Sequence, residues 1–373
     1  MLNNSITKVE WSIPTRILLG ESRIGEIEAQ LDYYGYKSPI IICDKLTAHS
    51  AIVRNLLRRL DRAHYSFGTY SEDIGYISDQ CIEFADEIIV KGEFDCVVAV
   101  GSSRIIAFAR LAASKIKKPV IAVTLTAGNT TEFSPYGFSY RVGEKYPVVT
   151  LHQMELPKLV LFDTALAGKQ NKALLVDSAL AILVHAIEAW CVGGYDPLAD
   201  NLSFEATKTM FTQLPQLINN PANHETHAHL LSAAVMAGLA GTNRQGATAA
   251  LARCLSFIYG VAYGKAAGLL LPHVLTYNLE TLDPRLTDLA NRLGIKGGSI
   301  GFAKALLKLR RIAGVPSKLT NLVGATKIKR KEKLLLEQMA VNHPLAHMSP
   351  VRFTQKAALT ILNAAIAGKM KRE

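Results

Sequence analysis

Cysteine, aromatic residues and long uninterrupted apolar runs are all scarce in this chain. Only five of its 373 residues are cysteines, and no two of them form a CxxC pair. Scattered cysteines in odd number argue against a disulfide framework or a structural zinc site, and they favour a reducing, cytoplasmic compartment. The most apolar stretch, residues 173–192, is interrupted by Asp177, His185 and Glu188, which argues against a membrane-spanning helix. The first residues lack the charged-then-apolar pattern of a secretory signal, so we expect none.

The chain is rich instead in core-forming apolar residues and in basic charge. Hydrophobic residues make up 49 % and charged residues 20 %, which is typical of globular proteins, and the length favours two domains. The net charge of +11 favours acidic partners. Much of the excess lies in Lys304, Lys308, Arg310, Arg311, Lys318, Lys327, Lys329, Arg330, Lys331 and Lys333. Because no aromatic residue interrupts this stretch for base stacking, we expect a solvated helical surface and no nucleic-acid site.

Residues 1–165 alternate strand-like and helix-like segments. The predicted strands are 11–20, 38–44, 64–70, 95–101, 119–125 and 156–163. The predicted helices between them are 24–35, 51–60, 77–92 and 103–116. This alternation predicts a parallel, doubly wound, Rossmann-like sheet. Ligands of such sheets bind at the carboxyl ends of the strands, which points to Asp44 and to the loops 101–104 and 125–131.

Strong strand signals cease after Asp163. The predicted helices beyond it are 172–192, 198–218, 228–260, 285–293, 300–313 and 354–368. We therefore expect an α/β domain over residues 1–167 and an all-helical domain over residues 168–373. In the helix around 177–190, an apolar stripe recurs at every third or fourth residue, and His185 and Glu188 form an i, i+3 pair beside it. A histidine on so apolar a helix is either a core residue or a site residue.

A second polar cluster, NHETHAHL, resembles a metal site only superficially. It contains His224, Glu225, His227 and His229 without the HExxH spacing of a zinc protease. We interpret it as a solvated helix N-terminus that Asn223 or Thr226 caps.

Several motifs, taken in order, resemble the iron-containing (group III) alcohol dehydrogenase and glycerol dehydrogenase superfamily. They are PTRILLG at 14–20, VAVGSSR at 98–104, TAGNTTEFSP at 126–135, HAIEAW at 185–190, GLLLPHVLTYN at 268–278 and HPLAHMS at 343–349. Each motif alone is weak to moderate, but their order and spacing are specific and cover nearly the whole chain. The resemblance implies the two-domain architecture above, an NAD or NADP cofactor, a catalytic metal and a homodimer.

The resemblance assigns the dinucleotide to two loops and two flanking side chains. The residues it implies are Asp44, Gly101, Ser102, Ser103, Thr126, Thr130 and Lys145. In the first loop the family has G-G-G-S followed by x-x-D, whereas here only Gly101 remains of the glycines and Ala107 stands for the aspartate. The second loop, 126–132, stands for the family's T-A-G-T-G-S-E and keeps hydroxyl groups for phosphate and nicotinamide.

The family holds its metal with one aspartate and three histidines. The resemblance places these four ligands at Ala181, His185, Ala249 (or Ala250) and Tyr263. One histidine cannot hold a catalytic divalent ion, so we expect no iron or zinc. His185 then becomes a pocket residue that hydrogen-bonds Tyr263 or a ligand.

Several residues appear where relatives have other groups around the cleft. They are Arg104, Arg244, Arg253, Tyr263 and Lys265, and they favour an anionic small-molecule ligand. Three functions stay open. The first is an oxidoreductase that uses His185, Arg253 or Tyr263 as electrophile or acid without a metal. The second is a non-catalytic descendant, a pseudoenzyme that binds a ligand or partner, and the third is a binder of nucleic acid or acidic protein through the basic stretch.

Overall fold

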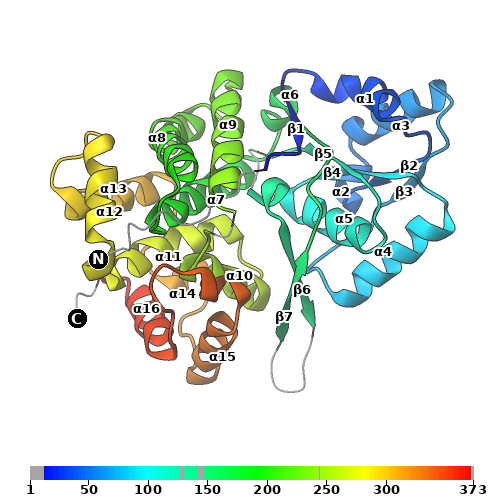
Figure 1. Cartoon of the computed structure of the whole chain (residues 1–373). Helices are drawn as coiled ribbons and strands as arrows, with labels where there is room; N and C mark the ends of the chain where they lie inside the picture. The colour runs from blue at the N-terminus through cyan, green and yellow to red at the C-terminus, as the bar shows by residue number, and fades with distance from the viewer. Residues whose placement is uncertain (1–11, 127–129, 142–146, 243, 371–373) are drawn as a thin grey trace.

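The computed structural model describes residues 12–126, 130–141, 147–242 and 244–370. Figure 1 shows a sheet flanked by helices in one half, a bundle of helices in the other, and a two-stranded hairpin running down between them. This is the predicted fold class, a parallel-sheet domain followed by a helical one.

The sheet has six parallel strands in the order β1-β8-β5-β4-β2-β3. Their bounds are β1 Arg16–Gly20, β2 Pro39–Ile42, β3 Gly68–Tyr70, β4 Cys96–Gly101, β5 Val120–Thr124 and β8 Leu159–Asp163. The central strands are buried along their whole length, which explains why their sequences are continuous apolar runs rather than alternating ones. The predicted parallel sheet is confirmed.

Helices cover both faces of this sheet. The elements are η1 Arg23–Glu26, α1 Ile27–Tyr34, α2 Lys45–Ala48, α3 Ala51–Arg62, α4 Asp79–Lys91 and α5 Ser103–Lys115. The core on one face joins α1 and α3 to the strands, and the core on the other joins α4 and α5. The chain leaves β2 towards the β3 edge and β4 towards β5, so the strand order reverses between β2 and β4. A crevice opens at the carboxyl ends of strands at such a switch point.

The hairpin between the two halves was not predicted. Strands β6 Tyr136–Arg141 and β7 Val148–Gln153 pair antiparallel, with Tyr136 opposite Gln153. On β7 exposed and half-buried positions do not alternate regularly, and two of its exposed residues, Val148 and Leu151, are apolar, so the sequence carries no clear strand pattern.

The second half is helical. Its elements are α6 Thr164–Ala167, α7 Lys172–Cys191, α8 Pro197–Asn219, α9 His224–Ala240, α10 Ala247–Tyr259, α11 Tyr263–Tyr277, α12 Leu279–Arg292, α13 Gly298–Ile312, α14 Leu319–Leu322, α15 Arg330–Val341 and α16 Gln355–Ala367, with 3-10 turns η2 Thr130–Phe133 and η3 Pro344–Met348. The single predicted helix 228–260 is in fact two, α9 and α10, because the chain turns between Gly241 and Gly246. Helices α11 and α15 were missed, α11 because Pro272, Gly264 and Gly268 resemble breakers.

Helix α7 lies at the centre of the helical half. By length and composition it is the one described helix that could cross a membrane, but 89 % of its apolar window is buried inside the protein. Its two carboxylates cap neighbouring helices: Asp177 Oδ1 accepts from the Lys265 backbone N–H of α11 at 2.7 Å, and Glu188 Oε1 accepts from the Thr248 N–H of α10 at 2.8 Å. Helices α10 and α11 therefore begin where α7 provides an acceptor for their unpaired N–H groups.

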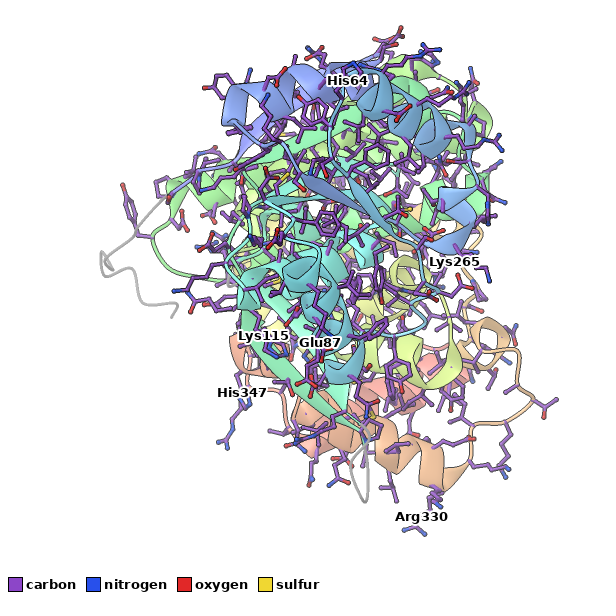
Figure 2. All side chains as sticks on the ribbon, turned by 90° about the vertical axis from the view of Figure 1, so that its right-hand side faces the viewer. His64, Glu87, Lys115, Lys265, Arg330 and His347 are labelled. Carbon is purple, nitrogen blue, oxygen red and sulfur yellow. The ribbon has the colours of Figure 1, made fainter. Side chains whose placement is uncertain are left out.

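Most of the basic C-terminal stretch lies at the surface. Its members from α13 to the start of α15 are largely exposed, as expected for a solvated helical face. Figure 2 shows Arg330 reaching outward at one end of the molecule, far from His64 at the other.

Candidate active-site cleft

A cavity of about 620 Å³ lies between the carboxyl ends of the strands and the helical half. On the sheet side it is lined by residues that include Asp44, Ser102 and Thr126, and on the helical side by residues that include Arg253 and Tyr263. The cleft therefore lies at the switch point between β2 and β4, as the predicted topology requires. We call these two sides the sheet wall and the helical wall.

The first predicted cofactor loop forms the turn from β4 into α5. Ser102 is the N-cap of α5, in extended conformation and without a side-chain hydrogen bond to the helix, and it lines the cleft together with Ser103. The first N–H groups of α5 thus remain available to an anion. A Cβ on Gly101 would lie 3.1 Å from Ile105 Cβ, which explains the glycine that remains at this turn.

The residues of the second predicted cofactor loop, and the predicted residues beside it, each have a different environment. The Thr126 hydroxyl is buried against the cleft and has no hydrogen-bond partner within the described ranges. The Thr130 hydroxyl instead contacts His185 Nδ1. Asp44 caps α2, accepting from the Thr47 N–H and hydroxyl at 2.8 Å each. Lys145 and residues 127–129 lie outside the described residues.

His185 is held by hydrogen bonds on both ring nitrogens. Nδ1 meets the Thr130 hydroxyl, and Nε2 lies 2.6 Å from the Tyr263 hydroxyl, so the expected bond between His185 and Tyr263 is present. The ring is fully buried, and burial together with the charge of Arg253 lowers the pKa of His185 to about 3. Burial also raises the pKa of Tyr263 well above its usual range. Both rings are therefore neutral at physiological pH.

The four positions to which the resemblance assigns metal ligands lie on three packed helices. Ala181 and His185 are on α7, Ala249 is on α10 and Tyr263 begins α11. The two alanines are buried and offer no donor atom. Across the described part of the chain, no three histidine, cysteine or acidic side chains gather as a metal could require.

The NHETHAHL cluster forms the start of α9 and has separate partners. Asn223 caps the helix by accepting from the Thr226 N–H at 3.0 Å, which confirms the predicted helix start. His224 pairs with Glu21 at 2.6 Å, whereas His227 Nε2 meets the Pro221 carbonyl at 2.7 Å. These side chains thus make separate contacts around the start of α9 and do not share a partner.

Arg253 is the cation of the helical wall. Its guanidinium carbon lies 4.9 Å from the Phe138 ring centre and 5.0 Å from that of Tyr263. No hydrogen bond or ion pair joins it to another described residue, and its Nε is buried without a partner. The side chain is thus held between two rings with its donors unused by the protein.

Two of the cations predicted around the cleft do not line it. Arg244 is buried outside the cleft. It forms ion pairs with Asp196, the N-cap of α8, at 3.2 Å and with Asp200 of α8 at 3.3 Å. Lys265 uses its backbone N–H for Asp177, and Figure 2 shows its side chain at the outline of the molecule. Of the predicted cations that the structure describes, Arg104 and Arg253 line the cleft.

Sequence reasoning missed several residues of the helical wall. They are Phe138, Tyr140, Gln245, Ser256 and Phe257. Ser256 follows Arg253 by three residues on α10, a spacing that would have placed it on the same helix face. Phe138 and Tyr140, which lie on β6, gave no such signal, because the hairpin itself was not predicted.

Comparison with known proteins agrees with this architecture. The family described as "Iron-containing alcohol dehydrogenase" matches residues 14–164, and "Fe-containing alcohol dehydrogenase family, C-terminal" matches residues 175–366. An alcohol dehydrogenase of Thermococcus barophilus is 24 % identical over 375 residues, covering 91 % of this chain and 95 % of the relative. The NAD-dependent methanol dehydrogenase of Bacillus methanolicus is 22 % identical over 331 residues, covering 82 % and 87 %.

Solved structures share the fold. An alcohol dehydrogenase from Oenococcus oeni superposes with a TM-score of 0.87 at 21 % identity, covering 96 % of this chain and 100 % of that one. Sulfoacetaldehyde reductase from Bifidobacterium kashiwanohense, in complex with NAD+, gives 0.84 at 21 % identity, covering 97 % and 99 %. The matched families together extend from β1 to α16, and the chain therefore belongs to the iron-containing alcohol dehydrogenase family.

Proposed function

We propose that this protein is an NAD(P)-dependent oxidoreductase that interconverts a small carbonyl compound and its alcohol without the family's metal ion. The observation that carries the proposal is the cleft itself. Unused donors at a helix N-terminus line its sheet wall, and a neutral tyrosine held by a buried histidine lines its helical wall.

The sheet wall fits a dinucleotide. The N-terminus of the 13-residue helix α5 opens into the cleft, and its N–H groups suit a pyrophosphate. The buried, unpartnered Thr126 hydroxyl supplies a further donor nearby. The backbone N–H groups of the turn at Ser102 and Ser103, together with the Thr126 hydroxyl, would hold the group, and the relative with bound NAD+ has the same fold. When bound in its reduced form, the cofactor supplies a hydride to the carbonyl carbon.

The helical wall does not fit iron or zinc. A catalytic metal needs three or more ligands, and the aligned positions provide one imidazole, one phenol and two methyl groups. The imidazole is also engaged on both nitrogens, by Thr130 and Tyr263. We therefore derive no step through a metal.

In its place, Tyr263 serves as the acid. Its hydroxyl proton passes to the carbonyl oxygen as that oxygen becomes an alkoxide, because an alkoxide is a stronger base than a phenolate. Water entering the cleft returns the proton afterwards. His185 is a positioning residue, since its bond to Thr130 fixes the ring that holds the Tyr263 hydroxyl. The nearby charge of Arg253 favours the phenolate that forms transiently, and it draws an anionic substrate into the cleft.

A pseudoenzyme is the second candidate. The observation in its favour is the first loop, where Ser102 and Ser103 add side chains beside the expected pyrophosphate and Ala107 replaces an acid. Such a protein would bind a ligand in the same cleft without turnover.

Titration of the purified protein with NADH and NADPH, followed by ligand fluorescence, tests the proposal. We expect saturable binding of one of them, and oxidation of the bound form on addition of a carbonyl compound. Binding without turnover across a broad carbonyl panel would favour the pseudoenzyme, and no binding of either dinucleotide would overturn both the cofactor and the reaction.

The assembly and the boundaries remain proposals as well. Within the described residues, strand β1 lies at the edge of the sheet and pairs with β8, and a sheet edge suits pairing with a second copy in a homodimer. We place the domain boundary between residues 167 and 168, after α6, and we expect the protein to be cytoplasmic. Light scattering coupled to size exclusion measures the oligomeric state, and limited proteolysis tests the domain boundary.

A further inference from the structure

We infer that the cleft takes an aromatic 2-oxo acid, with the carboxylate at Arg253, the carbonyl oxygen at Tyr263 and the aromatic body on the rings around them. The inference deepens the proposed function and rests on it for the reaction, although carboxylate binding can be tested separately.

The anion subsite begins with the unused charge of Arg253. A guanidinium that lies partly buried without a carboxylate partner is costly unless a ligand supplies the counter-charge. The acids that line the cavity are Asp44, Asp73 and Asp177. Asp44 accepts a hydrogen bond from the Thr47 N–H, and Asp177 accepts one from the Lys265 N–H. In the described structure, none of the three carboxylates forms an ion pair with Arg253. Among the described residues, the guanidinium of Arg253 therefore meets aromatic rings and no carboxylate.

A neighbouring hydroxyl group completes the subsite. Ser256 lies one helical turn after Arg253, lines the same cavity, and has a buried hydroxyl with no partner in the described structure. Buried polar groups are rarely left unpaired, so this hydroxyl and the guanidinium together indicate a polar ligand that accepts from Arg253 and Ser256.

The position of Tyr263 sets the distance between the charged and the reacting groups. Its ring centre is 5.0 Å from the guanidinium carbon of Arg253. The proton donor, Tyr263, and the group that binds the carboxylate, Arg253, are therefore neighbours. A substrate that reaches both needs its carbonyl close to its carboxylate. A 2-oxo acid meets this requirement, because the two groups are on adjacent carbons.

Three further aromatic side chains line the same cavity. Phe257 stacks on Tyr140 with ring centres 4.6 Å apart and an interplanar angle of 13°, and meets Tyr76 edge-on at 5.1 Å. All three line the cavity, and Tyr76 is 47 % exposed at its mouth. Such a surface favours a flat apolar body over an aliphatic polyol.

The test compares three probes under saturating NAD(P)H: phenylpyruvate, phenylacetaldehyde, which lacks the carboxylate, and pyruvate, which lacks the ring. We expect phenylpyruvate to have the highest kcat/KM, on the order of 100-fold above phenylacetaldehyde. In Arg253→Gln both substrates should turn over more slowly, because the charge that favours the Tyr263 phenolate is lost, and the preference for the carboxylate should vanish. Ser256→Ala should weaken it several-fold, and Arg54→Gln, on exposed α3 outside the cleft, should leave it unchanged.

Calorimetric titration with phenyllactate separates the inference from the reaction. Binding that Arg253→Gln weakens on the order of 100-fold supports the anion subsite even if no turnover is found. Equal kcat/KM for phenylpyruvate and phenylacetaldehyde in the unaltered protein, with dinucleotide bound, would overturn the inference and leave the proposed function standing. A preference that persists in a folded Arg253→Gln protein would overturn the role of Arg253.

Discussion

The sheet wall and the helical wall of the cleft are built in different ways. The sheet wall consists of strand ends and one helix N-terminus, so its ligand groups are mainly backbone N–H and short hydroxyls. The helical wall consists of long side chains from α10, α11 and the β6–β7 hairpin, and α7 supports them from behind. The first wall follows from topology, whereas the second depends on which side chains meet after folding. Changes in chemistry within one family can therefore be confined to the helical wall.

The largest effect is expected from a substitution that disturbs the packing of α11 on α7, which supports the helical wall. A Cβ on Gly264 would lie 1.8 Å from the Asp177 carbonyl oxygen, so Gly264→Ala must separate α11 from α7. We expect a loss of about 3 kcal/mol or more in the free energy of unfolding, measured by urea denaturation. Gly75→Ala is the matched control, because a Cβ there meets nothing within 4 Å. Equal stability of the two variants would contradict the close packing of α11 on α7.

The next largest effect is expected from a substitution that removes the proton donor of the helical wall and leaves the sheet wall unchanged. Tyr263→Phe deletes the acid and keeps the ring against Arg253. We expect kcat to fall by about 10²-fold or more, while the Kd of the dinucleotide, measured by fluorescence titration, stays unchanged. A variant that retains full kcat would show that Tyr263 is not the acid.

Acid should weaken the helical half before the sheet half. Burial lowers the pKa of His185 and His343 to about 3 and that of His273 to about 4, from an ordinary value of 6.5. The unfolded chain therefore binds protons that the folded chain refuses, so stability is full above pH 6.5 and falls as the pH drops towards 4. Each histidine contributes a slope of at most about 1.4 kcal/mol per pH unit.

Urea denaturation at pH 7, 6 and 5 measures this slope. His343→Gln should flatten it, and substitution of the exposed His64 by Gln should not. If the free energy of unfolding of the unaltered protein is the same at pH 7 and pH 5, the neutral burial of these histidines is contradicted.

The smallest expected effect sharpens the sheet wall. Ser102→Gly removes a side chain from the N-cap of α5, where glycine caps nearly as well as serine. We expect the dinucleotide Kd to tighten a few-fold, corresponding to less than about 1 kcal/mol, with no change in unfolding free energy beyond a few tenths. Weaker binding would show that the Ser102 hydroxyl is a cofactor contact.

The sequence was sufficient for the sheet and for the position of the cleft. Short apolar runs such as residues 95–101 predict buried parallel strands, and the strand ends then locate Asp44 and the 101–104 loop. It was not sufficient for the helical wall. Arg244 and Arg253 look alike in the sequence, yet Arg244 finds Asp196 and Asp200 while Arg253 finds only rings. Such pairings depend on helices that are distant in the sequence.

The most direct test of the central claim is the metal content of the active protein. Plasma mass spectrometry on protein incubated with Fe²⁺ or Zn²⁺ and then desalted, with carbonyl reduction assayed in the presence and absence of EDTA, measures both requirements. We predict well below one metal per chain, activity that EDTA does not change, and the same result for Ala181→Asp, because one restored carboxylate beside His185 leaves two positions without ligands. Stoichiometric iron or zinc together with activity lost in EDTA would contradict a metal-free cleft.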